Sequence, residues 1–271
     1  MDVTVVISNF NYSNYVSSAI ESCLDQSYPC SIIVVDDAST DNSWDIIRGY
    51  VQDGVKAVRL AKNSNGNARG KNIGISLSKT PYITCLDADD MLLPDSIKDR
   101  IPFPPDIDFV HGWSIFLKST DHYAGILSST NVLSRKFRYN ERQKKLQKEE
   151  EVRWTWAIEA STVLAHRSLY ERFGLYDEEM RWSIDREMWW RWLSHGAKKS
   201  VLPKFVSIYR RHEDQLTQDR KRKDPKLCSR MLKDRQSSRK NISKKNTILM
   251  DNYNIDKYIE EILSRTPGLK S

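Results

Sequence analysis

The chain has 271 residues, of which 39% are hydrophobic and 29% are charged, so it can form one large domain or two small ones. No stretch approaches the roughly 18 consecutive apolar residues of a membrane-spanning helix, and the acidic start at Met1–Thr4 does not look like a secretory signal. The four cysteines contain no Cys-x-x-Cys pair; they are Cys23, Cys30, Cys85 and Cys228. We therefore expect reduced thiols in a cytoplasmic protein.

The net charge of +7 is concentrated near the C-terminus, because residues 220–245 contain twelve Lys or Arg and two Asp. The simplest interpretation is a solvated, partly disordered segment. A sharper one is peripheral contact with an anionic membrane at its inner face, where lipid-linked acceptors reside. Nucleic acid is a third option, but no recognisable nucleic-acid motif accompanies the charge, so we do not expect it as a partner.

The first 110 residues alternate strand patterns with helical ones. Short β-branched runs predict strands at 3–7, 31–35, 55–60 and 82–86. Apolar residues at helical spacing predict helices from 14 to 24, from 44 to 51 and from 68 to 77. We expect side-chain caps from Ser13 or Asn14 on the first helix, and from Ser39, Thr40 or Asp41 on the second. This alternation implies parallel βαβ units.

Polar clusters follow three of these strands, at Ser8-Asn9, Asp36-Asp37 and Asp87 to Asp90. In parallel sheets, ligands gather beyond the carboxyl ends of the strands. We therefore expect carboxylates from two strands to face one crevice. Asp87 and Asp89, directly after a strand, can hold a hard divalent cation that neutralises a diphosphate. The alternative is a turn with Asp caps, and a three-residue pattern alone has little specificity.

The second half of the chain is less regular. Residues 135–151 are charged on nearly all sides and predict a solvated helix or a mobile loop. An aromatic-rich helix is expected at 184–193 and a strand at 201–208. The polar tail has one amphipathic stretch near 258–263.

Several motifs together resemble glycosyltransferase family 2, whose members have the GT-A fold. They cover about residues 3–217, in family order: Val5 to Tyr12, Ser22 to Gln26, Ile32 to Ser43, Asn65-Gly66, Lys71 to Gly74, Leu86 to Asp90, Phe173 to Asp177 and Asp185 to Arg191. The resemblance implies an α/β GT-A domain with a mixed, mainly parallel sheet. Its nucleotide-sugar-binding half would be 1–112 and its acceptor-binding half 113–217. Residues 218–271 would form a basic, helical C-terminal extension.

The same resemblance implies a metal-dependent, inverting glycosyltransferase that acts in polysaccharide biosynthesis. A sugar would move from a nucleotide donor, with UDP as the expected carrier, to the hydroxyl of a glycan or lipid-linked acceptor. Mn²⁺ or Mg²⁺ would be the cofactor.

Residue roles follow from the matched motifs. Asp37, with Asp36 beside it, would accept the uracil N3 proton, and Asp87 would lie near the ribose. Asp89 would bind the metal ion, and His212 matches a position where a histidine can complete the metal site. The resemblance implies three further residues of the nucleotide site, which would be Ser8, Asn9 and Ala88. The acidic residues and His212 also have a structural interpretation, since acidic turns precede many helices and a lone histidine is more often structural.

Two departures from the family pattern concern charged positions. Lys71 stands where the family usually has Arg, so it would meet a donor phosphate as a point charge, and Arg69 could share that contact. Asp185 matches the catalytic base, which takes a proton from the acceptor hydroxyl, but Ile184 replaces the usual Glu. By helical spacing, Asp185 shares a face with Met188, so it is either a cap or a working group.

Six of the eight tryptophans lie within 154–192, where indole faces could stack on sugars. Large aromatic side chains mostly fill cores, so we expect at least three of them there, with Trp182 as the best candidate for an exposed platform. Arg210 and Arg211 would either meet phosphates or be solvated.

Two other functions compete with glycosyl transfer. A sugar nucleotidyltransferase also uses an α/β domain and Mg²⁺, but it normally has a Gly-rich phosphate loop, and Ser8 to Tyr12 contains no glycine. A non-catalytic polyanion- or nucleotide-binding protein on the same fold is the second alternative. The intact Asp87, Asp89 and Asp185 argue against such a degenerate enzyme.

Overall fold

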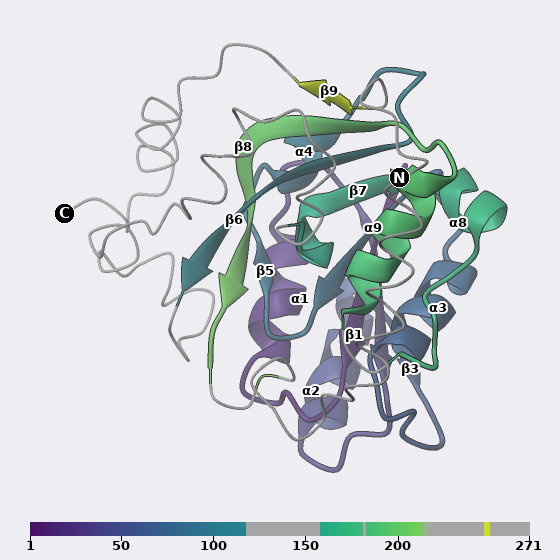
Figure 1. The fold of residues 1–271 in the computed structure, drawn as a ribbon. Helices are drawn as coiled ribbons and strands as arrows, with labels where there is room; N and C mark the ends of the chain where they lie inside the picture. The colour runs from purple at the N-terminus through teal and green to yellow at the C-terminus, as the bar shows by residue number, and fades with distance from the viewer. Residues whose placement is uncertain (118–157, 181–182, 213–214, 216–246, 250–271) are drawn as a thin grey trace.

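The computed structural model describes residues 1–117, 158–180, 183–212, 215 and 247–249. In these ranges the chain forms one sheet of nine strands in the order β3-β2-β1-β4-β7-β6-β8-β5, with β9 beside β8 (Figure 1). The strands are β1 (Val3–Asn9), β2 (Ser31–Asp36), β3 (Lys56–Arg59), β4 (Tyr82–Asp87), β5 (Met91–Leu92), β6 (Phe109–Leu117), β7 (Val163–His166), β8 (Lys199–Arg210) and β9 (Thr247–Leu249).

The sheet is mixed and mainly parallel, as the sequence predicts. Strands β3, β2, β1 and β4 run parallel, and β7 is antiparallel to both β4 and β6. Strand β8 is parallel to β6 and β9 and antiparallel to β5. The predicted helical extension falls almost wholly outside the described residues.

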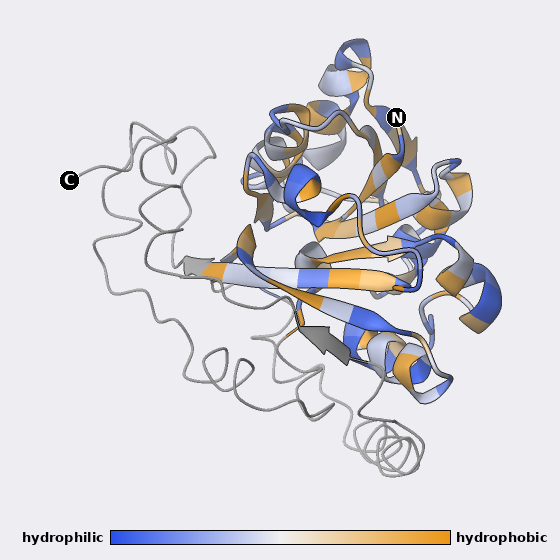
Figure 2. Ribbon diagram, turned by 90° about the horizontal axis from the view of Figure 1, so that it is seen from above, coloured by the Kyte–Doolittle hydropathy of each residue, from blue (hydrophilic) through white to orange (hydrophobic). Residues whose placement is uncertain are grey.

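Helices cover both faces of the sheet. They are α1 (Val16–Leu24), α2 (Ser43–Gly49), α3 (Ala68–Leu77), α4 (Ser96–Arg100), α8 (Ser168–Phe173) and α9 (Ile184–Ser194), with short 3₁₀ turns η1 (Tyr50–Asp53) and η3 (Ala160–Thr162). Alternate residues of β1 explain the two layers. Val5 and Ile7 belong to a core with α1 and α2, whereas Val6 belongs to a second core with α3, α8 and α9. Figure 2 shows hydrophobic residues running along the strands between these layers.

Gly74 sets the close packing of α3 on β1. A Cβ at this position would lie 2.2 Å from Cγ1 of Val6, so glycine is required for the observed approach. The approach brings the N-terminal part of α3, with Lys71, to the ends of the strands.

The predicted elements that fall in the described ranges are confirmed to within about two residues at most ends, but the predicted caps are wrong. Tyr15 and Asn42 precede α1 and α2 without a side-chain cap bond. The Asp41 carboxylate instead accepts the main-chain N–H groups of Ser13 and Ser43 and joins the two loops. Val51 does not continue α2; it lies in η1 and is 52% exposed.

The sequence patterns did not predict β5, α4, β6, β7 or α8. Residues 135–151 and 258–263, Cys228 and Trp182 lie outside the described residues. Strand β6 crosses the expected boundary at residue 112, so the two halves share one sheet, and the division of the chain stays a prediction. Cys23, Cys30 and Cys85 are free thiols. Of the helices described, none has the length and apolar character needed to cross a membrane.

Candidate functional site

The strand register brings the three polar clusters to one edge of the sheet. Asn9 at the end of β1 pairs with Asp36 at the end of β2, and Ser8 pairs with Asp87 at the end of β4. Because these strands are parallel, all three clusters lie at their carboxyl ends, where open α/β sheets bind ligands.

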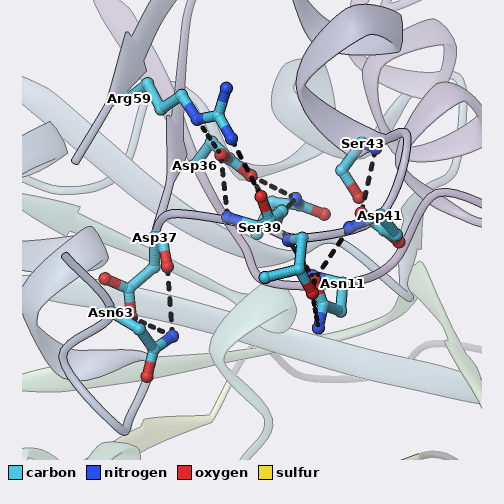
Figure 3. A network of polar contacts seen from close by, with 10 residues as sticks. Asn11, Asp36, Asp37, Ser39, Asp41, Ser43, Arg59 and Asn63 are labelled. Atoms are coloured by element: carbon cyan, nitrogen blue, oxygen red, sulfur yellow. Dashed lines mark hydrogen bonds and ion pairs between the residues drawn. The ribbon is translucent and has the colours of Figure 1, made fainter. Parts of the chain in front are cut away.

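Asp36 is fully engaged in holding this edge together. Its buried carboxylate accepts hydrogen bonds from the Asn9 side chain at 2.8 Å and from the hydroxyl and main-chain N–H of Ser39. The Arg59 guanidinium lies 3.4 Å from its second oxygen (Figure 3). Both oxygens therefore have two partners, which leaves Asp36 no free acceptor position for a nucleobase.

Asp37 is bonded mainly through one of its two carboxylate oxygens. Its Oδ2 accepts the Ser64 hydroxyl at 2.6 Å, the Ser64 N–H at 3.1 Å and the Asn63 amide at 3.3 Å. Among the described residues, its Oδ1 has one donor, the Ser64 N–H at 3.0 Å. Figure 3 shows Asn63 beside Asp37, away from the Asp36 network. A carboxylate oxygen can accept two bonds, so Oδ1 keeps one position for an N–H donor.

The other expected nucleotide contacts are buried. Ser8 lies under α3, with its hydroxyl unpaired among the described residues. The Asn9 amide nitrogen serves Asp36 and Ser39, so this side chain is a structural tie. The Ala88 side chain belongs to the core, and only its main chain could meet a donor.

Lys71 links the end of β4 to α9 through two ion pairs. Its side chain is completely buried, and its ammonium lies 3.0 Å from Oδ1 of Asp87 and 3.1 Å from Oδ1 of Asp185. Burial by itself would lower the pKa of the Lys71 ammonium, but Asp185 and Asp87 outweigh it and raise that pKa. Arg69, the alternative phosphate contact, is exposed on the outer side of α3.

Asp185 lies in the first turn of α9, and its side chain is not a cap. Ser183 precedes the helix in the left-handed region, and its side chain forms no cap bond either. Burial raises the pKa of the Asp185 carboxyl, Lys71 opposes this, and Asp87 adds to it, so the pKa lies above its ordinary value. The side chain is still 24% exposed. A carboxylate with these properties suits proton abstraction better than an ordinary surface Asp.

Asn72 fixes the loop that leads to α9. Its amide donates to the Tyr176 carbonyl at 2.9 Å, and its oxygen accepts the Tyr176 N–H at 2.9 Å. The Tyr176 ring lies 5.3 Å from the Lys71 ammonium. The segment 173–177 thereby joins α3 and closes the apolar side of the Lys71–Asp185 pair.

Asp89, two residues beyond the end of β4, contacts His212, two residues beyond the end of β8. Nε2 of His212 lies 3.1 Å from Oδ2 of Asp89, and the imidazole packs against Tyr15 at 4.3 Å and Tyr12 at 5.6 Å between ring centroids. Gln215 approaches the same carboxylate oxygen at 3.5 Å. The sequence grouped Asp89 with His212, and the structure places their side chains in contact.

The donor set fits a divalent ion that keeps open positions. Two ligands at right angles on an octahedral ion with bonds of about 2.1 Å lie about 3 Å apart, close to the Asp89–His212 separation. Within the described ranges, no group of three or more His, Cys, Asp or Glu residues could hold a metal. The remaining ligands would have to be diphosphate oxygens and water, as is usual for Mg²⁺.

The neighbouring residues Arg210 and Arg211 have different environments. Arg210 is not solvated, contrary to one of the two interpretations; it is buried, with its guanidinium 4.9 Å from the Tyr15 ring centroid. The main-chain N–H of Arg210 donates to the Asp90 carboxylate at 3.0 Å. Burial, with Asp89 and Asp87 nearby, raises the pKa of the Asp90 carboxyl well above its ordinary value. Arg211 is exposed, as one of the two interpretations held.

The tryptophans of α9 are core residues. Trp189, Trp190 and Trp192 are all buried, which confirms the expectation of at least three in the core. Trp192 lies against Tyr170, and Trp189 donates to the Ile158 carbonyl at 3.2 Å.

Sequence reasoning missed Glu159 and Ser64. Ser114 donates to the Glu159 carboxylate at 3.3 Å, and burial raises the pKa of this carboxyl to about 7. The charge of Glu159 contributes to the raised pKa of Asp90, and the charge of Asp185 contributes to the raised pKa of Glu159, so Glu159 belongs to the same region. Nothing local in the sequence marks Glu159. The polar turn 63–67 was visible, but its contact with Asp37 is tertiary.

Comparisons with known proteins agree with this geometry. Residues 4–156 match the sequence model of the family described as Glycosyl transferase family 2. Glycosyltransferase GlyG of Streptococcus pneumoniae is 39% identical over 98 residues, 35% of this chain and 33% of GlyG. The Escherichia coli protein WfaP, a UDP-Glc:alpha-D-GlcNAc-diphosphoundecaprenol beta-1,3-glucosyltransferase, is 33% identical over 104 residues, 37% of this chain and 40% of WfaP. The matches thus span well under half of either relative.

A solved structure shares the architecture. S. aureus TarS 1–349 in complex with UDP-GlcNAc superposes with a TM-score of 0.70 at 16% sequence identity, covering 100% of this chain and 74% of that chain. At this identity the likeness concerns the fold.

Proposed function

From the premise that this chain belongs to glycosyl transferase family 2 and has a GT-A fold, we propose that it is a metal-dependent, inverting transferase that takes its sugar from a UDP donor. One observation carries the proposal. Asp37, Asp87 and Asp89 gather at the carboxyl ends of parallel strands, and Asp185 reaches the same place from α9 through Lys71. The donor carboxylates and the base thus meet at one site.

The nucleotide is recognised by Asp37. Its Oδ1 retains an acceptor position suited to the N3–H of uracil, while Ser64 and Asn63 hold the other oxygen in place. Asp87, 28% exposed beside Lys71, faces the ribose. TarS has been solved with UDP-GlcNAc, and the name of WfaP specifies UDP-Glc, which supports the choice of UDP.

Asp89 and His212 hold Mn²⁺ or Mg²⁺ at the diphosphate. The ion supplies charge neutralisation for the departing nucleotide, so a second protein acid is not required. The buried Asp89 carboxylate and the imidazole nitrogen are the protein ligands, and the rings of Tyr12 and Tyr15 hold the imidazole in its orientation.

Asp185 accepts the proton of the acceptor hydroxyl as that oxygen attacks the anomeric carbon. The attack takes place opposite the leaving nucleotide and inverts the configuration. The acceptor belongs to the class of glycans or lipid-linked sugars, which the name of WfaP supports by its diphosphoundecaprenol substrate. Contact of 220–245 with an anionic membrane is a further part of this proposal.

The test is UDP release from a panel of UDP-sugars with Mn²⁺ or with EDTA, comparing the native chain with Asp89→Ala. Slow hydrolysis of the donor needs no acceptor. We expect release from one UDP-sugar, dependent on metal, and reduced at least about 100-fold in Asp89→Ala because the diphosphate loses its ion.

Asp106→Ala is the matched control, since this carboxylate is 58% exposed and precedes the amino end of β6, which runs in the same direction as β4 and so starts at the opposite end of the sheet from the site. Absence of release across the panel, together with no Mn²⁺-dependent UDP binding by calorimetry, would overturn the UDP assignment. Release of pyrophosphate from a nucleoside triphosphate and a sugar phosphate would favour a nucleotidyltransferase instead.

A further inference from the structure

Lys71 occupies an unusual position for a residue expected to contact the donor phosphates. Its side chain has no exposure to solvent, and burying an ammonium is costly unless carboxylates compensate it. Two do so, Asp87 at 3.0 Å and Asp185 at 3.1 Å. Tyr176 covers the ammonium from a third side at 5.3 Å.

The charge of this cluster does not suit a phosphate. One ammonium and two carboxylates sum to a net negative charge, which repels a diphosphate unless a metal ion intervenes. Two of the three ammonium protons point at carboxylates, and the third belongs to a side chain with no solvent exposure, so a phosphate oxygen could reach it only by displacing a neighbouring group. The geometry instead makes Lys71 a bridge between the donor side and the acceptor side of the site.

We propose that Lys71 is a positioning residue that acts through Asp185: it holds this carboxylate beside Asp87, ready for the acceptor hydroxyl, and does not bind the donor phosphates. The inference rests on the proposed function, because Asp185 is the proposed base. It assigns to Lys71 a role on the acceptor side of the reaction, opposite to the one its sequence position suggested.

Several groups besides Lys71 face Asp185. Asp87 and Cys85 lie on β4, Tyr170 on α8, Tyr176 in the loop before α9, and Glu159 before η3. Burial and Asp87 raise the pKa of Asp185, and the Lys71 ammonium opposes them. Loss of the Lys71 charge would therefore raise the pKa of Asp185 further, and less of the base would be ionised at neutral pH.

The experiment is a double-mutant cycle with Lys71→Met, Asp185→Asn and both together. We expect Lys71→Met to lower kcat by about 100-fold, as for a misplaced base, and to change the KM for the donor by less than about threefold. Its effect should vanish when Asp185→Asn is already present, because Lys71 then has no base to position. The acid limb of the kcat–pH profile of Lys71→Met should move to higher pH.

Lys79→Met is the matched control, since Lys79 is exposed just beyond the end of α3 and should behave as the native chain. Lys71→Gln, which keeps a hydrogen-bond donor but removes the charge, guards against misfolding of the Met variant. UDP binding by calorimetry reports whether each variant retains a formed donor site.

The experiment distinguishes failure of the role assigned to Lys71 from failure of the base assignment of Asp185. If Lys71→Met or Lys71→Gln raises the donor KM or the Kd for UDP at least tenfold with kcat unchanged, Lys71 contacts the donor and the inference is overturned. The inference is also overturned if the fold-loss of kcat in the double variant equals the product of the fold-losses in the Lys71 variant and in Asp185→Asn. If Asp185→Asn alone keeps full transfer activity, the base assignment of the proposed function falls first, and the role of Lys71 falls with it.

Discussion

At the scale of single residues, Asp36 and Asp37 show how neighbours in sequence take different tasks. Both are acidic residues at the end of β2, and apart from the family resemblance the residue pattern does not separate their roles. The strand end turns them in different directions, so that Asp36 binds Asn9 and Ser39 while Asp37 faces Ser64. The first carboxylate has no acceptor position to spare, and the second has one.

This difference predicts opposite phenotypes for two conservative changes. Asp36→Asn places an amide nitrogen among donors, so we expect a loss of about 1–3 kcal/mol in the free energy of unfolding, measured by urea denaturation. Asp37→Asn keeps one oxygen for the Ser64 and Asn63 donors but presents an amide nitrogen to N3–H, so UDP affinity should fall about tenfold or more by calorimetry. Asp45→Asn, at an exposed ion pair, is the control. Weak UDP binding in Asp36→Asn with normal binding in Asp37→Asn would reverse the two roles.

At the scale of elements, α3 decides where the charged groups meet. The helix approaches β1 closely enough that a Cβ on Gly74 would lie 2.2 Å from Val6, and this places Lys71 over the strand ends. The helix itself was predicted from its apolar spacing with the observed bounds. Its packing distance was not predictable, because a glycine in a helical pattern does not say which strand it will meet.

Two glycine substitutions test this packing. Gly74→Ala should lower the free energy of unfolding by about 1–3 kcal/mol, since the new methyl group overlaps the Val6 side chain. Gly49→Ala, at the end of α2 with helical backbone angles and no atom within 4 Å of the new Cβ, should be neutral or stabilising by up to about 1 kcal/mol. Equal effects of the two changes in thermal or urea unfolding would contradict the close contact between α3 and β1.

At the scale of the whole molecule, one sheet joins the donor and acceptor sides, and its central strands bury ionisable groups. His111 of β6 is buried opposite Val201 of β8, and the buried Lys199 lies two residues earlier on β8. Burial, then Lys199, lowers the pKa of His111 to about 3. The unfolded chain therefore binds a proton at this histidine below about pH 6.5, whereas the native chain does so only near pH 3.

The stability that neutral His111 contributes is consequently present above about pH 6.5 and is lost as the pH falls toward 3. Each unit of pKa shift corresponds to about 1.4 kcal/mol at most, so His111 can account for a few kcal/mol. We expect urea unfolding from pH 7.5 to 4.5 to show a smaller decline in His111→Gln than in the native chain. His195→Gln, at an exposed position, should follow the native curve. Parallel curves for the native chain and His111→Gln would contradict this account.

The sequence by itself determined the parallel βαβ units and the order of polar clusters after the strands, because period-2 and period-3.6 patterns are local properties of the chain. It also indicated the family through ordered motifs, and it placed Asp89 with His212 and Asp185 in α9. Only the tertiary structure decided which of Asp36 and Asp37 keeps an acceptor position, that Arg210 is buried, and that Glu159 joins the site. These outcomes depend on register and on which helix packs over which strand. Lys71 shows the reason most clearly, since 114 residues separate it from Asp185 and only the packing of α3 against the 173–177 segment brings them together.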